Sequence, residues 1–253
     1  MVSFTLAQLE GWLAFLLLPF LRVLALFTAA PLLSHRSVPM RARVAAAGVI
    51  GFVVAPFAGV PAGLSLASAS GLGLVAQQVF IGLTIGFAAR LLFAVFELAG
   101  ECIGLQMGLS FAGFFDPHGG TESAVGSWLH TLAMLLFVAL DGHLLLVDAV
   151  VASFRSLPIA AGDPFAVLRL VRLDLLGGDV FRLALSLALP ATVLMLFVNL
   201  VLGFASRVAP QMNLFAIGFP VTLLAGLAAL TLGVPHLLPA LLDALTVFLG
   251  PLR

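Results

Sequence analysis

The stretch LGLVAQQVFIGLTIGFAARLLFAVFELA, from Leu72 to Ala99, decides the class of this protein. It is longer than the roughly 20 apolar residues that cross a bilayer as a helix, and its charged residues are Arg90 and Glu97. Comparable apolar blocks lie at Trp12–Leu33, Val44–Phe57, Leu129–Val151, Phe181–Phe204 and Leu214–Leu245, with a shorter one at Cys102–Phe115. The pattern predicts an all-α, multi-helix integral membrane protein.

The composition excludes a soluble globular domain. The chain has 253 residues, of which 62% are hydrophobic and 9% charged, and its mean hydropathy is +1.25. Soluble domains carry about 25% charged residues. The formal net charge is zero, so we expect no nucleic-acid partner. With no soluble segment and no repeat that can be aligned, residues 1–253 are expected to form one domain.

The apolar blocks are poor membrane helices in detail. Pro19 and Arg22 interrupt the first block, Pro56 ends the second, and further prolines fall at 190, 220, 235 and 239. A charge in the middle of a span costs about 2.5–3.5 kcal/mol, whereas each strong apolar residue returns only about 0.3–0.6 kcal/mol. We therefore expect broken helices and helical hairpins, and pairing within a protein assembly for the charged residues Arg90, Glu97, Glu101, Asp141 and Asp148.

The distribution of arginines also favours a chain that is part of a larger protein assembly. Arg36, Arg41 and Arg43 predict a cytoplasmic loop by the positive-inside rule. Counting spans from there leaves residues 152–179 outside, although Arg155, Arg169 and Arg172 lie in that segment. A chain that fails this rule and has marginal spans fits a larger assembly better than a simple bundle.

Catalytic and metal chemistry have weak support. Residues Gly108 to Ala112 match a G-x-S-x-G/A turn around Ser110, with histidines at 130, 143 and 236 as possible partners, but small residues also allow close helix packing. Asp141, His143 and Asp148 could form a proton relay or simply pair between helices. The histidines lack metal spacing, and a lone cysteine cannot build a zinc site. We expect no enzyme activity, no catalytic residues, no metal and no cofactor.

Three segments carry a resemblance: RVLALFTAAPLLSHRSVP (Arg22–Pro39), FELAGECIGLQMGLSFAGFFDP (Phe96–Pro117) and SRVAPQMNLFAIGFP (Ser206–Pro220). They resemble the FliR family of export-gate proteins, which has a counterpart in virulence type III secretion. The resemblance covers essentially the whole chain. Its most diagnostic positions are Arg207, Pro210, Gln211, Asn213, Phe215, Gly218, Phe219 and Pro220.

The resemblance implies an all-helical, non-enzymatic subunit of the flagellar type III protein export gate. Such subunits assemble with FliP and FliQ into a closed helical cone, much of which stands above the plane of the inner membrane. The implied partners are FliP, FliQ, FlhB and FlhA homologues, unfolded flagellar proteins passing through the channel, and membrane lipid. The implied location is the bacterial inner membrane, as a multi-pass protein of the flagellar basal body.

Two segments acquire roles through this resemblance. The segment Ser110–Gly120 corresponds to a pore plug, with Phe111, Phe114 and Phe115 as apolar bulk and Gly113 leaving room to move; apolar rings seal pores by excluding water. The alternative is that these phenylalanines pack against helices. Arg207, Pro210, Gln211 and Asn213 correspond to a loop at the cytoplasmic mouth, beside FliQ and FlhB.

Two other functions stay open from the residues alone. A secondary transporter would use broken helices and buried charges as an ion and substrate site, but it predicts an internal repeat. An intramembrane serine protease predicts a serine–histidine pair.

Overall fold

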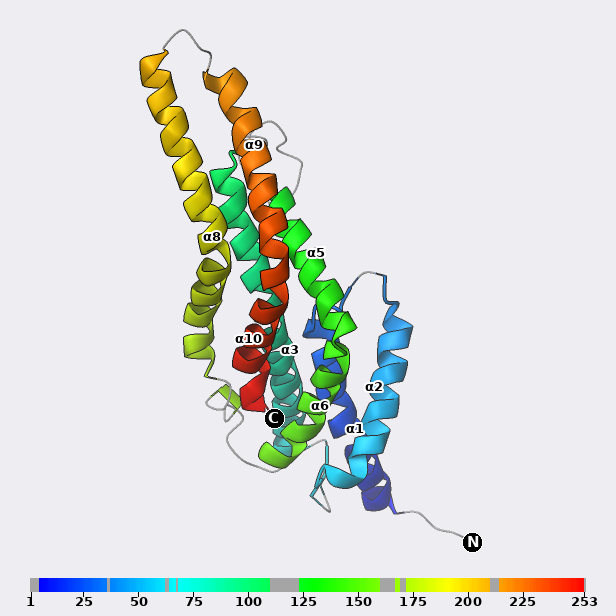
Figure 1. Cartoon of the computed structure of the whole chain (residues 1–253). Coiled ribbons are helices and arrows are strands. Elements are labelled where there is room, and N and C mark those ends of the chain that lie inside the picture. The colour runs from blue at the N-terminus through cyan, green and yellow to red at the C-terminus, as the bar shows by residue number, and fades with distance from the viewer. Residues whose placement is uncertain are drawn as a thin grey trace. The chain divides into compact units, whose positions relative to one another are not determined.

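The computed structural model describes residues 5–35, 37–61, 64–66, 68–109, 123–159, 167–168, 172–209 and 214–252. Within these ranges the regular structure is helical, with no strand, which confirms the predicted all-α class. In chain order the elements are α1 (Leu6–Ala29), α2 (Met40–Val54), η1 (Ala55–Phe57), α3 (Ala69–Gln106), α5 (Ala124–Ala139), α6 (Gly142–Ser156), α8 (Leu173–Val208), α9 (Leu214–Gly233), η2 (Val234–His236), α10 (Leu237–Leu249) and η3 (Gly250–Leu252) (Figure 1).

The chain forms two compact units. The first unit comprises Met1–Leu91, Asp141–Leu176 and Thr246–Arg253, and the second comprises Leu92–Leu140 and Gly177–Leu245. Helix α3 is continuous and contributes residues to both.

In the first unit, small residues bring the helices close together. A Cβ added at Gly51 of α2 would lie 2.8 Å from the Cα atom of Phe20 in α1. A Cβ at Gly82 of α3 would overlap the backbone carbonyl oxygen of Arg22, and one at Gly86 would lie 2.5 Å from the Cβ of Ala29. Glycine removes the side chain that would hold these helix backbones apart, so Gly82 and Gly86 of α3 form a packing face for α1.

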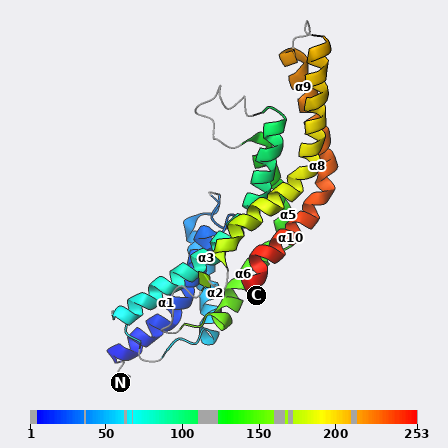
Figure 2. The ribbon, with the colours of Figure 1, turned by 90° about the vertical axis from the view of Figure 1, so that its left-hand side faces the viewer.

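In the second unit, glycines again allow close contacts, between α3 and α5 and between α9 and the residue that follows α3. The backbones of Gly100 in α3 and Gly126 in α5 meet so closely that a Cβ on Gly100 would lie 2.5 Å from the Cα of Gly126. Directly after α3, Met107 fills the space beside Gly226 of α9. The Thr222 hydroxyl donates to the Met107 carbonyl oxygen over 3.2 Å. Most of α8, and the run from α9 through η2 to most of α10, belong to this unit and form the two arms of a hairpin (Figures 1 and 2).

Three of the expected helix interruptions are wrong. Pro19, Pro190 and Pro220 lie inside α1, α8 and α9, which continue through them. A proline removes one backbone hydrogen bond and can kink a helix, but the many remaining bonds of these long helices persist on both sides. Pro56 does end a span, because it lies in η1 directly after α2, and Pro235 lies in the 3-10 turn η2.

The apolar block Leu129–Val151 is two helices rather than one. Helix α5 ends at Ala139, and α6 begins at Gly142 after Asp141, whose φ of 56° places it in the left-handed region. Such a residue ends the regular α-helix. The dipeptide Asp141-Gly142 is a turn signal that could have located this break.

The described helices are long and apolar enough for a membrane protein. Five meet the requirements of length and hydropathy for crossing a bilayer, at Gln8–Ala29, Met40–Phe57, Ala69–Gln106, Leu175–Val208 and Ile217–Leu249, and the broken pair α5–α6 could provide a sixth crossing. This confirms the prediction of a multi-helix membrane protein.

Candidate functional site

The most extensively bonded side chain described in the first unit is Arg22, in the middle of α1. It is fully buried. Its Nε donates to the Gln78 side-chain oxygen of α3 over 2.8 Å. Its Nη1 donates to the Ser153 carbonyl and hydroxyl oxygens over 2.9 and 3.0 Å, and its Nη2 donates to the Leu157 carbonyl over 2.9 Å. The guanidinium carbon also lies 4.0 Å from the centre of the Phe154 ring, close enough for a cation–π contact.

Sequence reasoning treated Arg22 only as an interruption of α1 and missed its partners. Gln78 lies 56 residues away, Ser153 of α6 lies 131 residues away, and Leu157, the C-cap of α6, lies 135 residues away. Two features of the sequence could have indicated these partners: Arg22 is a charged residue in one apolar block, and Gln77-Gln78 is a polar pair in another apolar block. Polar groups inside membrane proteins usually bond to one another.

In the second unit, Glu101 joins α3 to the start of α5. Its Oε1 accepts a hydrogen bond from the backbone N–H of Ser123 over 2.7 Å. The hydroxyl of Ser123 accepts from the Gly126 N–H over 3.0 Å and thereby caps α5. The bond between Glu101 and the Ser123 N–H lies beside the contact between Gly100 and Gly126, so both interactions hold α3 against the start of α5.

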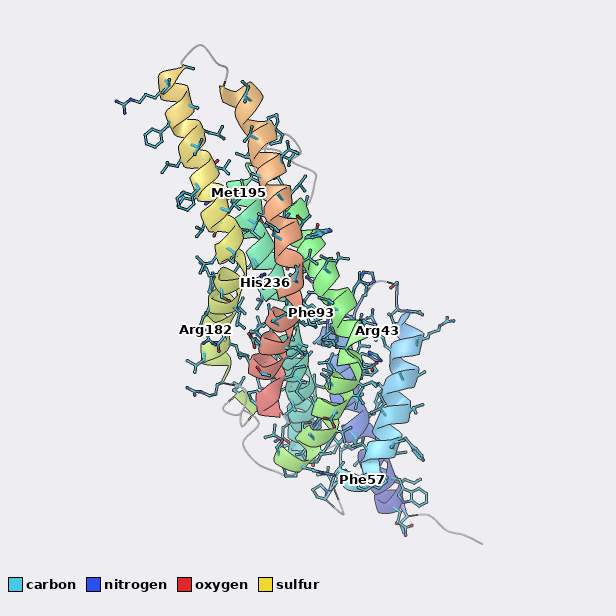
Figure 3. The ribbon with its side chains drawn as sticks, in the orientation of Figure 1. Arg43, Phe57, Phe93, Arg182, Met195 and His236 are labelled. Carbon is cyan, nitrogen blue, oxygen red and sulfur yellow. The ribbon has the colours of Figure 1, made fainter. Side chains whose placement is uncertain are left out.

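One turn earlier, Glu97 faces His130 of α5. The Glu97 Oε2 and His130 Nδ1 atoms are 3.9 Å apart. The Phe93 ring centre lies 5.8 Å from that of His130 and 5.2 Å from that of Phe137, the latter in an edge-to-face arrangement (Figure 3 labels Phe93). Both members of the Glu97–His130 pair are partly exposed, so the pair contributes little to stability by itself.

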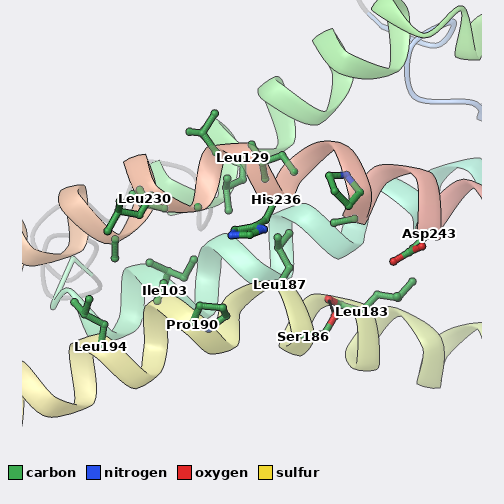
Figure 4. Close-up of a pocket in the computed structure, with 18 residues that line it drawn as sticks. Ile103, Leu129, Leu183, Ser186, Leu187, Pro190, Leu194, Leu230, His236 and Asp243 are labelled. Carbon is green, nitrogen blue, oxygen red and sulfur yellow. Dashed lines mark hydrogen bonds between the residues drawn. The ribbon is translucent and has the colours of Figure 1, made fainter.

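A cavity of about 440 Å³ lies within the second unit. Its lining comes from α3, α5, α8 and α9–α10 and is mostly apolar, with Ser186, His236 and Asp243 as its principal polar side chains (Figure 4). Its size is typical of a small-molecule pocket. In the part of the chain that the structure describes, no three His, Cys, Asp or Glu residues are grouped to hold a metal ion.

The hairpin of the second unit exposes a large apolar surface, which we call the hairpin face. In the apolar 18-residue segment of Leu175–Val208, only 17% of the residues are buried, and in that of Ile217–Leu249, 22%. The corresponding share in α3 is 61%. The exposed residues of this face are Leu185, Leu189, Val193, Leu196, Phe197, Leu200, Val201 and Phe204 on α8, and Leu224, Leu227, Leu232, Leu238 and Leu242 on α9–α10.

Of the residues predicted for the plug and the mouth, the structure describes only Arg207. Phe111, Gly113, Phe114 and Phe115 lie outside the described residues, as do Pro210, Gln211 and Asn213. Arg207 is described: it lies exposed in the last turn of α8. The roles of all of them stay predictions.

The five predicted paired charges are not gathered into one site. Glu97 and Glu101 form the α3–α5 contacts given above. Arg90, Asp141 and Asp148 are exposed on this chain. Their pairing within a larger assembly stays a prediction.

The histidines of the two catalytic alternatives are also distributed. His130 lies beside Glu97, and His236 lines the cavity. His143 lies in the first turn of α6, where its Nδ1 is buried and has no hydrogen-bond partner among the described residues. Ser110, which the protease alternative requires, lies outside the described residues.

Comparison with known proteins identifies the family. Residues 13–247 match the model of "Bacterial export proteins, family 1". The chain is 42% identical over 241 residues to the flagellar biosynthetic protein FliR of Escherichia coli (strain K12), which covers 94% of this chain and 91% of that protein. The chain belongs to the FliR family.

Similarity to FliR proteins of other bacteria supports the same family assignment. That of Pectobacterium carotovorum subsp. carotovorum is 40% identical over 241 residues, covering 94% of this chain and 91% of that FliR. That of Aquifex aeolicus (strain VF5) is 30% identical over 227 residues, covering 89% of this chain and 87% of that FliR. The predicted resemblance is confirmed. As a FliR-family chain with several apolar helices, this protein is a flagellar export component of the membrane-protein class.

Proposed function

We propose that this chain is a structural and gating subunit of the flagellar type III export gate, assembled with FliP and FliQ homologues in the bacterial inner membrane. It has no enzymatic role in this proposal. The observation that carries the proposal is the hairpin face, because its length and its exposure together demand a protein partner.

The two arms of the hairpin are too long for lipid to cover them. Their apolar helical spans run for 34 and 33 residues, which is about 50 Å at 1.5 Å per residue. The hydrocarbon core of a bilayer is about 30 Å thick, and ordinary tilts of up to roughly 40° would not absorb the difference. By contrast, the 18-residue span Met40–Phe57 measures about 27 Å and fits a bilayer.

Exposed apolar surface of this extent marks an interaction site. Part of the hairpin face therefore requires cover from other protein helices. Membership of a family of flagellar export proteins supports the choice of partners, namely FliP and FliQ homologues, with FlhB and FlhA homologues at the cytoplasmic side.

A gating role is proposed for Phe111, Phe114 and Phe115. They are placed next to Gly113 and before Asp116-Pro117 in the sequence, so bulky apolar groups adjoin residues that end helices. An apolar ring would exclude water and ions from a protein-conducting pore, and it would part for an unfolded substrate because it forms few directional bonds.

A contact role at the cytoplasmic mouth is proposed for Arg207, together with Pro210, Gln211 and Asn213. The exposed guanidinium of Arg207 at the end of α8 can donate to a carboxylate or to loop carbonyls of a neighbouring subunit.

The experiment that tests the assembly is purification after gentle detergent extraction. Co-produced with FliP and FliQ homologues, the tagged chain should elute as one complex containing all three proteins. A chain that purifies alone, monodisperse and folded, despite the presence of both homologues would contradict the proposal and would favour the secondary transporter.

The gating role has its own test in a planar bilayer. Replacing Phe111, Phe114 and Phe115 together by Ala should leave the complex assembled but raise its ion conductance. The matched control replaces Phe52 and Phe57, which are exposed in the first unit, and should leave conductance unchanged. An assembled triple variant that conducts no more than the unmodified complex would assign the seal to another subunit.

A further inference from the structure

We propose that Arg22 is a positioning residue that caps the C-terminal end of α6 from α1, and thereby fixes the point at which the chain leaves α6. The proposal is independent of the gate assignment, since it rests entirely on contacts within the first unit.

The acceptors of Arg22 identify its role. The carbonyls of Ser153 and Leu157 lie at the end of α6, which finishes at Ser156. The Leu157 carbonyl is one of the last four carbonyls, which have no partner within the helix and form the negative end of the helix dipole. The Ser153 carbonyl already accepts from the Leu157 N–H over 2.9 Å, and Arg22 is its second donor. A guanidinium is therefore well matched to this position both as a donor and as a charge.

The remaining bonds orient the guanidinium plane. Gln78 of α3 accepts from Nε over 2.8 Å, so the guanidinium is bonded at Nε as well as at both terminal nitrogens. The Ser153 hydroxyl accepts from Nη1 and itself donates to the Val150 carbonyl over 2.6 Å. The Phe154 ring lies over the guanidinium at 4.0 Å.

All four acceptors of Arg22 are neutral groups: one amide oxygen, one hydroxyl and two backbone carbonyls. The charge of Arg22 is thus held by dipoles and by an aromatic face. Lysine could not reproduce the arrangement, because its ammonium is a point charge without the planar fork that reaches several acceptors at fixed angles.

The exposure of Ile159, a buried residue just beyond the end of α6, can show whether Arg22 still caps the helix. Ile159 follows Leu157 by two residues and is 1% exposed. If Arg22 holds the end of α6, losing the cap should free Ile159 first. Ala149, which is fully buried in the body of α6, should stay protected.

The test uses thiol labelling of the full-length chain in its native complex. Cys102 is first replaced by Ser, since it is the only cysteine. Either Ile159→Cys or Ala149→Cys is then introduced, and labelling by a membrane-permeant maleimide is followed with Arg22 retained, with Arg22→Lys and with Arg22→Met. The Met variant keeps an unbranched apolar stem but has no donor.

We expect labelling at position 159 to accelerate at least about tenfold in Arg22→Lys, as the loss of one or two charge-assisted bonds would give, and further in Arg22→Met. Labelling at position 149 should change less than about twofold in the Lys variant. Unchanged labelling at position 159 in both variants would overturn the proposal. Equal acceleration at both positions in the Lys variant would also overturn it, because Arg22 would then support the whole core rather than the end of α6.

Discussion

The surroundings of Arg22 and the hairpin face differ in how the surfaces of their helices are covered. Around Arg22, polar groups from α1, α3 and α6 satisfy one another inside the first unit. On the hairpin of the second unit, α8 and α9–α10 turn bulky apolar side chains outward over their length. The first region completes its contacts within the chain, whereas the second requires other molecules. A substitution should therefore act on folding in the first region and on assembly in the second.

The largest effect is expected for Arg22→Met. The substitution leaves the Leu157 carbonyl and the Gln78 amide oxygen without their donor, at about 1–3 kcal/mol for each buried unsatisfied group. It also removes the second of two donors to the Ser153 carbonyl, which keeps the Leu157 N–H. We expect a loss of about 3 kcal/mol or more, and a several-fold lower steady-state level in the membrane. Immunoblotting of membranes measures this.

Arg41→Met is the matched control, because Arg41 is an exposed arginine of the first unit and is not among the charges predicted to pair. It should leave the level of the chain unchanged within about 0.5 kcal/mol of stability. Equal loss in both variants would contradict a special role for Arg22 in the first unit.

An intermediate effect is expected for Gly100→Ala. A Cβ at this position would lie 2.5 Å from the Cα of Gly126 and 2.7 Å from its backbone nitrogen, so α3 and α5 would have to separate. Such overpacking typically costs about 1–3 kcal/mol. Gly203 of α8 has open space around its Cβ position, and Gly203→Ala should be neutral or slightly stabilising because alanine favours the helix.

Thermal denaturation of the purified complexes compares these two alanine variants. A complex carrying Gly100→Ala should denature at a lower temperature than one carrying Gly203→Ala. Indistinguishable transitions would show that the α3–α5 contact relaxes readily, and would weaken the contrast between close-packed and exposed positions within α3 and α8.

The smallest effect on stability is expected for Arg207→Ala, because this side chain is exposed at the end of α8. Its stability should change by no more than about 0.5 kcal/mol, while flagellar protein export falls. Arg182→Ala is the control: Arg182 is also exposed on α8, and it pairs with Asp179 within the chain over 3.0 Å. Export assays of culture supernatants compare the two, and equal export in both variants would remove the proposed contact at the mouth.

Local patterns predicted much of the fold. The apolar blocks located α1, α2, α3 and α8, because a span of about 20 apolar residues leaves a signal within one stretch of sequence. Pro56 correctly marked the end of α2. The family followed from the segments around Phe96–Pro117 and Ser206–Pro220, and the matching FliR proteins confirm it.

The remainder depends on distant contacts. Pro19 and Pro190 were expected to interrupt their blocks, yet α1 and α8 continue through both, because one lost hydrogen bond does not outweigh the rest of a long helix. Arg22 was unreadable as a cap because its acceptors come from other helices. The meeting of Gly100 and Gly126 likewise requires two helices to be placed before it can be seen.

The central claim, that partner subunits cover the hairpin face, is tested most directly by site-specific photo-crosslinking in cells. A photoreactive amino acid replaces Phe197, which is 65% exposed on α8, and, as the matched control, Phe137, which is fully buried on α5. Position 197 should yield adducts with the FliP or FliQ homologue, and position 137 should yield none. Absence of any subunit adduct at position 197, in cells that assemble flagella normally, would contradict the account.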